Sequence, residues 1–162
     1  MLYEKFGEFN SADEINELAA NLREEGDVES IRILAEENGI PKDYAEIMIS
    51  GEWPFLCDPT TAAIGKIEVE VADLQPKGIM VDWAEYIKAC CMEDGKMAEN
   101  VRRKGKSIKG CFGKLLKYSF EHAEDVDGDI VKAAGINAGK VKFGMPGQKE
   151  ARKLIKKYYG GA

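Results

Sequence analysis

One histidine and four cysteines are the side chains of this chain best suited to nucleophilic or metal chemistry. The histidine, His122, shares a predicted helix with Cys111, about 16 Å away at 1.5 Å per residue, which is too far for a shared metal ion. A Cys–His nucleophile would need the fold to bring Cys57, Cys90 or Cys91 to His122. Without a C-x-x-C pair, we interpret the thiols as reduced apolar side chains. We expect no catalytic residue, metal or cofactor, although carboxylate-only chemistry stays open.

Two short motifs resemble parts of ligand-binding loops but lack residues that those loops need. Residues 125–129 have the spacing that begins a calcium loop, but Ile130 and Ile136 replace its central glycine and final glutamate. Residues 105–107 read Gly-Lys-Ser like the end of a phosphate-binding loop, but Asn100 stands where that loop has its first glycine. We therefore interpret the first motif as an acidic turn that caps a helix, and the serine of the second as a helix cap.

Charge is distributed very unevenly along the chain. Residues 1–100 carry 23 acidic and 8 basic side chains, a net charge of −15, whereas residues 101–162 carry 6 acidic and 15 basic ones, a net charge of +9. Such asymmetry points either to a charged partner or to two halves of one domain that neutralise each other. The sequence leaves both interpretations open.

The acidic half contains the candidate contacts for a basic partner. Residues 34–51 fit much of a helix-turn-helix template, but Asn38 stands at a position that is usually apolar. Residues 24–52 carry nine acidic and two basic side chains, so phosphates would be repelled, and we expect a helical corner that does not read DNA. The candidate acidic partner-binding residues are Glu24, Glu25, Glu29, Glu36, Glu37, Asp43 and Glu46.

The basic half contains the candidate contacts for a nucleic acid or another acidic surface. Its lysines and arginines recur at helical spacing opposite the apolar residues, which is typical either of a solvated face or of a polyanion footprint. The candidate basic residues are Arg102, Arg103, Lys106, Lys109, Lys117, Lys149, Arg152, Lys153 and Lys156.

Helical signals surround all of these candidates. Ser11 and Glu14 form a predicted capping box, apolar residues then recur at i, i+3, i+4 and i+7, and Gly26 marks the end of that helix. Residues 67–71 alternate like a strand, so a strand remains the alternative there. We predict an all-α, compact bundle of about eight short helices, with an N-terminal helical corner and a loop or short extended segment near 141–145. The predicted helical segments are 11–26, 27–39, 41–51, 58–74, 80–91, 97–104, 107–121, 129–134 and 148–159.

The chain has the size and composition of one soluble domain spanning residues 1–162. Its apolar content of 44% supports a core, and no stretch has the roughly 18 apolar residues of a membrane helix. The first residues lack the apolar segment of a signal peptide. We therefore expect a cytoplasmic protein that does not enter a membrane.

Four sequence blocks resemble a group of short uncharacterised accessory proteins carried by phages and mobile elements of Firmicutes. The blocks are residues 9–16, 34–40 and 101–107, and the Pro146-Gly147 pair before the basic tail. The resemblance carries no catalytic signature and implies a setting in which small acidic proteins often inhibit host defence, anti-CRISPR proteins among them.

Together these patterns predict a non-enzymatic interaction protein. The leading hypothesis is an anti-CRISPR-like inhibitor whose acidic half binds a basic host protein or a nucleoprotein complex. The alternative is a nucleic-acid-binding accessory protein that uses the basic C-terminal helices. The sequence leaves the identity of the partner and the oligomeric state undetermined.

Overall fold

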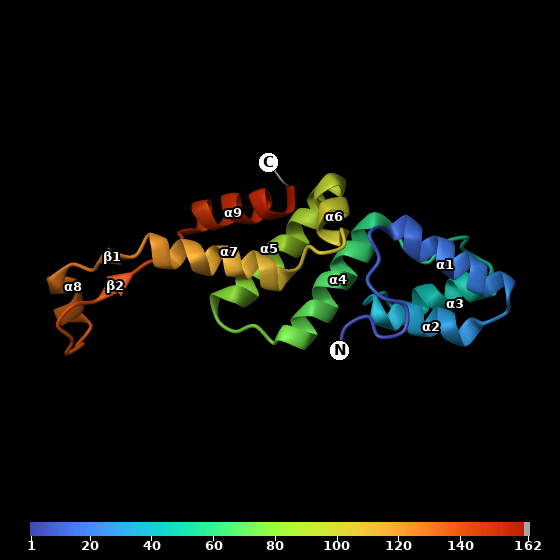
Figure 1. Ribbon diagram of the computed structural model, residues 1–162, viewed down its shortest axis with the longest axis horizontal. Helices are drawn as coiled ribbons and strands as arrows, with labels where there is room; N and C mark the ends of the chain where they lie inside the picture. Colours follow the sequence, from blue (N-terminus) through green and yellow to red (C-terminus); the bar gives the residue numbers. More distant parts are fainter. Residues whose placement is uncertain (161–162) are drawn as a thin grey trace. The chain divides into compact units, whose positions relative to one another are not determined.

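The structure, a computed structural model, describes residues 1–160, which are predominantly helical (Figure 1). This range contains nine α-helices and one small antiparallel ribbon of two strands, so the predicted all-α class is confirmed. The helices are α1 (Ala12–Glu24), α2 (Val28–Glu37), α3 (Lys42–Ser50), α4 (Pro59–Leu74), α5 (Ile79–Glu93), α6 (Gly95–Arg102), α7 (Ile108–Glu121), α8 (Gly128–Ala133) and α9 (Gln148–Gly160), and the strands are β1 (Glu124–Asp125) and β2 (Lys142–Phe143).

The chain divides into two compact units. Unit 1 is Met1–Lys109 and unit 2 is Gly110–Ala162, so the boundary falls close to the change in charge seen in the sequence. Unit 1 carries 23 acidic and 13 basic residues, a net charge of −10, and unit 2 carries 6 acidic and 10 basic residues, a net charge of +4. Each unit therefore has its own dominant charge.

The capping box predicted before α1 is present in unit 1, with one difference. The hydroxyl of Ser11 accepts a hydrogen bond from Glu14 N at 3.2 Å, as a capping box requires. The carboxylate of Glu14 reaches one residue further back than expected, because it accepts from Asn10 N at 2.7 Å. The first bond satisfies a backbone donor that a helix start leaves without a partner, and the second fixes the chain immediately before α1.

The predicted helical corner is present as α2 and α3, and it packs on α4 through two glycines. Gly39 has a φ of +64°, a left-handed conformation that favours glycine. A Cβ atom on Gly39 would overlap the backbone of Gly65 in α4, and a Cβ on Gly65 would overlap the carbonyl oxygen of Asn38. The two glycines therefore allow the α2–α3 turn to approach the backbone of α4 directly.

The strand alternative for residues 67–71 is wrong, because they lie inside α4. The side chain of Asp58 caps this helix by accepting from Thr61 N at 2.7 Å, and Pro59 occupies its first turn. The helix packs against α1, α5 and α6, and the buried side chains along it include Ile67 and two charged residues, Lys66 and Glu70. The alternation arises because polar and apolar residues of α4 are both buried, so sequence polarity does not follow the exposed face.

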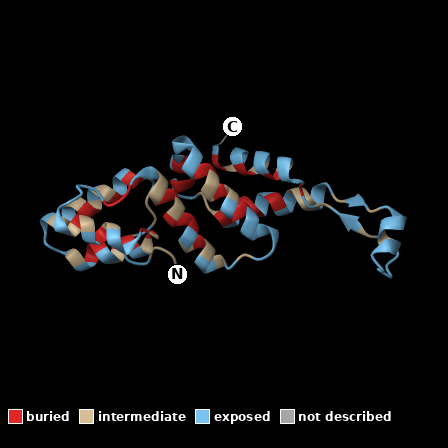
Figure 2. Cartoon of the chain, turned by 180° about the vertical axis from the view of Figure 1, so that it is seen from behind, coloured by how far each residue is buried: buried red, intermediate tan, exposed pale blue. Residues whose placement is uncertain are grey.

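In unit 2, the extended segment expected near 141–145 is the strand β2. It pairs antiparallel with β1, with Glu124 opposite Phe143. Figure 1 shows this ribbon and α8 forming an arm beyond the end of α7, and Figure 2 shows that most of the arm is exposed. The acidic turn predicted before α8 is present, because Asp127 accepts from Asp129 N at 2.9 Å and caps the helix.

Candidate functional site

Six of the seven predicted acidic contacts are exposed in unit 1. Arg32 of α2 joins two of them, since its Nε donates to Glu46 at 2.7 Å and its Nη1 donates to Glu29 at 3.4 Å. The hydrogen bonds from Arg32 hold the pKa of Glu46 below its ordinary value. This part of unit 1 remains acidic, because Arg32 pairs with only two of the six exposed carboxylates. We call the acidic surface the set Glu24, Glu25, Glu29, Glu36, Asp43 and Glu46.

The seventh acidic residue, Glu37, has a structural contact instead. Its side chain accepts hydrogen bonds from the backbone N–H groups of Lys5 at 2.6 Å and Phe6 at 3.2 Å. The carboxylate thereby anchors the segment that precedes α1 to the end of α2. A partner contact at Glu37 would compete with these bonds, so we do not include it in the acidic surface.

Most of the predicted basic contacts are exposed as well. On α9, four of them share the side opposite the buried Ala151, Ile155 and Tyr159, and Lys157 is exposed beside them. The only acidic side chain within α9 is Glu150, which lies 4.0 Å from Lys153. We call the basic face of α9 the set Lys149, Arg152, Lys153, Lys156 and Lys157.

The remaining basic candidates lie before or on α7 and are less uniform. Lys109 and Lys117 are exposed, and Lys117 forms an ion pair with Glu121 at 3.6 Å. Arg103 is exposed in the α6–α7 link, whereas Lys106 is half-buried. These side chains do not repeat the one-sided arrangement of α9.

Arg102 is buried, so its predicted place among the surface contacts is wrong. Only 1% of this residue is exposed. Its Nη2 donates to Asn38 Oδ1 at 2.8 Å, and its guanidinium lies 5.8 Å from the ring centroid of Tyr3. Its Nε and Nη1 have no hydrogen-bond partner within residues 1–160. Helical spacing places this arginine on the inner side of α6, where its charge faces the core of unit 1.

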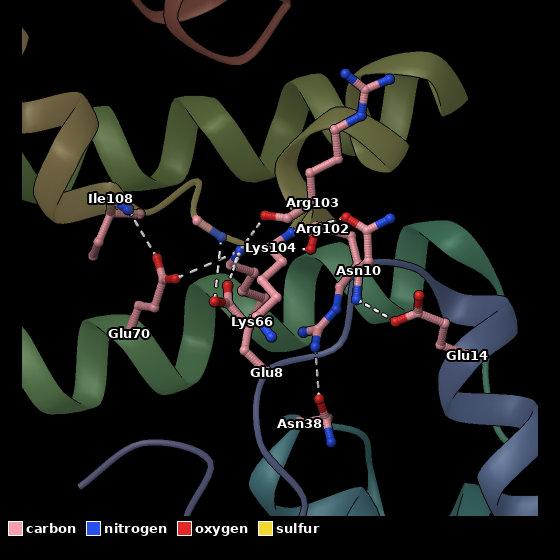
Figure 3. A network of polar contacts seen from close by, with 11 residues as sticks. Glu8, Asn10, Glu14, Asn38, Lys66, Glu70, Arg102, Arg103, Lys104 and Ile108 are labelled. Atoms are coloured by element: carbon pink, nitrogen blue, oxygen red, sulfur yellow. Dashed lines mark hydrogen bonds and ion pairs between the residues drawn. The ribbon is translucent and has the colours of Figure 1, made fainter.

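Arg102 belongs to a network of buried charges centred on Lys66 of α4 (Figure 3). Lys66 Nζ donates to Glu8 Oε1 at 2.7 Å and to the carbonyl oxygen of Arg103 at 2.8 Å. It also lies 4.0 Å from Glu70, whose other oxygen accepts from Ile108 N at 2.8 Å. The network therefore ties the segment before α1 and the α6–α7 link to the middle of α4.

Burial opposes the ionisation of Lys66, Glu70 and Tyr3. Removal from water lowers the pKa of Lys66 and raises the pKa of Glu70, despite the attraction between the two charges. Burial also raises the pKa of Tyr3 to about 12, against the opposing effect of the nearby Arg102. A buried charge left without its partner destabilises the folded state. We therefore expect each member of this network to contribute to the stability of unit 1.

One signal in the sequence points to this network. Asn38 interrupts the apolar pattern of the helical corner, and the structure explains why: it is fully buried, accepts from Arg102, and donates to Leu34 O at 2.8 Å. Nothing in the sequence pairs residue 38 with residue 102, because the two are distant along the chain.

The four cysteines are buried, whereas the histidine is exposed. Burial raises the pKa of Cys57, Cys91 and Cys111 to about 12, so their thiolate forms are scarce near neutral pH. The ring of His122 is exposed and stacks on Tyr118, with centroids 4.0 Å apart. These thiols therefore pack as apolar side chains.

Residues 1–160 contain no group of three or more His, Cys, Asp or Glu side chains arranged to hold a metal ion. In the same range, no helix combines the length and apolarity needed to cross a membrane. Comparisons with protein-family models, curated proteins and solved structures found no match. The candidate functional regions are therefore defined by surface charge and exposed side chains.

Proposed function

We propose that this protein acts without catalysis, by binding a basic protein partner through its acidic surface. The observation that carries the proposal is the exposure of six carboxylates on α1–α3 and at the C-cap of α1, of which Arg32 pairs with two, while the apolar sides of the same helices form a core. Such a surface repels phosphates and attracts lysine- and arginine-rich proteins.

The kind of partner follows from this charge and from the resemblance to phage and mobile-element proteins. A protein that holds nucleic acid has a basic channel, and a rigid acidic surface can compete for that channel. The proposed role is therefore that of an anti-CRISPR-like inhibitor of a bacterial defence nucleoprotein complex. Attraction between exposed charges weakens as salt screens it, so association is expected to be salt-sensitive.

A charge-reversal experiment with a matched control tests this proposal. Glu24 and Glu36 lie in the last turns of α1 and α2, and Asp73 and Glu93 lie in the last turns of α4 and α5. All four are exposed, and replacing either pair with lysine changes the net charge equally. Lysine is also favourable at a helix C-terminus, so neither variant should lose stability.

The binding partner is first captured from a nuclease-treated extract of the source organism, then identified and purified. We expect Glu24→Lys/Glu36→Lys to slow association with it about tenfold at low salt. The Asp73→Lys/Glu93→Lys control should have a much smaller effect. Equal association rates for both variants would show that the acidic surface is not the contact.

The basic face of α9 favours a second candidate function, which is the binding of nucleic acid. Four exposed cations on one side of a helix match a phosphate backbone, and each phosphate contact releases counterions. Replacing Lys149, Arg152, Lys153 and Lys156 by Gln should then abolish a salt-sensitive gel shift and leave the melting temperature nearly unchanged. If these charges are instead neutralised by the acidic half of the chain, the variant should melt lower and neither form should bind nucleic acid.

A further inference from the structure

An aromatic cluster joins Tyr44, a half-buried residue of α3, to two exposed rings of the segment that follows this helix. The rings of Tyr44 and Trp53 meet edge to face, with centroids 5.5 Å apart, and the rings of Trp53 and Phe55 are 6.1 Å apart. Trp53 is 42% exposed and Phe55 is 44% exposed. Clustered exposed aromatic rings are unusual on a protein surface and are typical of binding sites. We call Tyr44, Trp53 and Phe55 the aromatic cluster.

Backbone hydrogen bonds fix the segment that carries the cluster at its start. Gly51 ends α3 with a φ of +86°, and the chain then folds back so that Trp53 N donates to Ile47 O at 3.4 Å. Arg23 Nη1 donates to the carbonyl oxygens of Met48 and Trp53, both at 3.3 Å. The backbone of Trp53 is therefore held on both of its polar groups.

The end of the segment is fixed by one side chain of α1. Asn16 Oδ1 accepts from Leu56 N at 2.9 Å and from Cys57 N at 3.0 Å, and Asn16 Nδ2 donates to Cys57 O at 2.7 Å. Leu56 and Cys57 are buried, whereas the two residues before them are exposed. The cluster is thus presented on a rigid support, which reduces the entropy lost when a ligand binds.

The charges beside the cluster are mainly acidic. Exposed Glu52 precedes Trp53, exposed Asp43 precedes Tyr44, and exposed Glu24 follows Arg23. Two cations lie near these residues in the sequence: Lys42 is exposed, and Arg23 has its Nη1 committed to two carbonyl oxygens. Aromatic faces attract cations, and nearby carboxylates strengthen that preference.

Among cations, the guanidinium group fits this arrangement better than an ammonium group does. It is planar and weakly hydrated, so it can stack on an indole ring while its N–H groups donate to a carboxylate. A lysine ammonium is compact and strongly hydrated, and gains less from a flat aromatic surface. The combination of rings and carboxylates therefore discriminates between the two basic side chains.

We propose that the aromatic cluster is the docking site for an arginine-rich segment of the basic partner. The proposal rests on the proposed function and names the chemistry of the segment that the acidic surface attracts. The carboxylates supply long-range attraction to any basic protein, and the cluster supplies short-range selectivity for arginine.

Calorimetric titration with an oligo-arginine peptide and an oligo-lysine peptide of equal length tests this proposal. We expect the protein to bind oligo-arginine more tightly, and we expect Trp53→Ala to weaken that binding about fivefold or more. The affinity for oligo-lysine should change by less than about twofold, because ammonium groups rely on the carboxylates. Trp53→Phe keeps an apolar ring between Tyr44 and Phe55 and should give an intermediate loss.

Phe143→Ala is the matched control, since Phe143 is an exposed aromatic residue in unit 2. It should leave both affinities unchanged. If wild-type protein binds oligo-arginine no more tightly than oligo-lysine, and Trp53→Ala changes neither affinity, the cluster is not an arginine site. The proposed function would survive that result as long as Glu24→Lys/Glu36→Lys weakens the binding of both peptides. If neither peptide binds the wild-type protein and that double variant associates normally with the purified partner, both proposals fail.

Discussion

Replacing Lys66 by Met should destabilise unit 1 far more than removing any exposed lysine. Methionine has a similar length and suits a buried helical position, so the substitution removes the ammonium group with little change in packing. Three acceptors then lose their donor, namely Glu8 Oε1 at 2.7 Å, the carbonyl oxygen of Arg103 at 2.8 Å and that of Arg102 at 3.5 Å. Glu70, 4.0 Å away, also loses its nearby positive charge.

The expected loss follows from the burial of these groups. Lys66 and Glu70 have side-chain exposures of 1% and 8%, and Glu8 has 23%, so water can replace the lost contacts only in part. Removing one partner of a buried ion pair costs about 3–5 kcal/mol. For a domain of this size, each kcal/mol lowers the melting temperature by about 2–8 °C, so the predicted decrease exceeds about 6 °C.

Lys96 provides the matched control. It also lies on a helix of unit 1 and forms an ion pair three residues along, with Glu99 at 3.2 Å, but its side chain is 68% exposed. Lys96→Met should cost less than about 1 kcal/mol, because exposed ion pairs contribute little. Urea unfolding followed by circular dichroism measures both variants.

A third variant separates the loss of charge balance from the loss of packing. Combining Lys66→Met with Glu8→Gln and Glu70→Gln removes both carboxylates together with their ammonium partner, so neither carboxylate is left without Lys66. Neutral replacements of buried ion pairs are often tolerated, so the triple variant should recover much of the lost stability. If Lys66→Met costs no more than Lys96→Met, the network does not support the fold in the way described.

Three further predictions follow from the same region and from the thiols. Because burial raises the pKa of Glu70 above its ordinary value of 4.5, the folded state binds its proton more tightly than the unfolded state. This contribution to stability is present below pH 4.5 and is lost as the pH rises through the folded-state pKa. Acidification from neutral pH should therefore stabilise the wild-type protein relative to Glu70→Gln, as measured by urea titration. Parallel curves of unfolding free energy against pH for the two proteins would contradict this. Asn38→Leu should cost about 3 kcal/mol, because it removes the side-chain oxygen that accepts a hydrogen bond from Arg102; a loss below about 1 kcal/mol in the same assay would refute the buried contact. Thiol reagents should label the folded protein slowly at mildly alkaline pH, since burial raises the pKa of Cys57 and Cys111 to about 12; labelling as fast as in denaturant would be the opposing result.

Local signals in the sequence were sufficient to predict most of the helices. Caps such as Ser11 and Asp58, and stops such as Gly26 and Gly51, act within one or two turns, so their effects can be read from neighbouring residues. The exposure of the basic residues of α9 follows from the same short-range periodicity. Whether these residues bind a partner stays a prediction, because exposure alone does not identify a ligand.

The buried network could not be predicted, because its contacts join distant parts of the chain. Lys66 meets Glu8 across 58 positions, and Arg102 meets Asn38 across 64. Helical spacing indicates that Arg102 lies on one side of α6, but only the packing of α6 on α4 determines that this side is buried. The aromatic cluster has a related origin, since an irregular segment acquires its shape from Asn16 and Ile47 rather than from its own residues.

The network and the acidic surface meet at the end of α2, and this connection decides which residues report on binding. Glu36 is exposed and can be reversed without disturbing a contact seen in the structure, whereas the adjacent Glu37 holds Lys5 N and Phe6 N. The same N-terminal segment carries Glu8 to Lys66. Reversal of Glu37 would therefore release this segment and weaken the buried ion pair. A loss of binding in that variant would follow from a change in fold, so only the exposed carboxylates test the acidic surface itself.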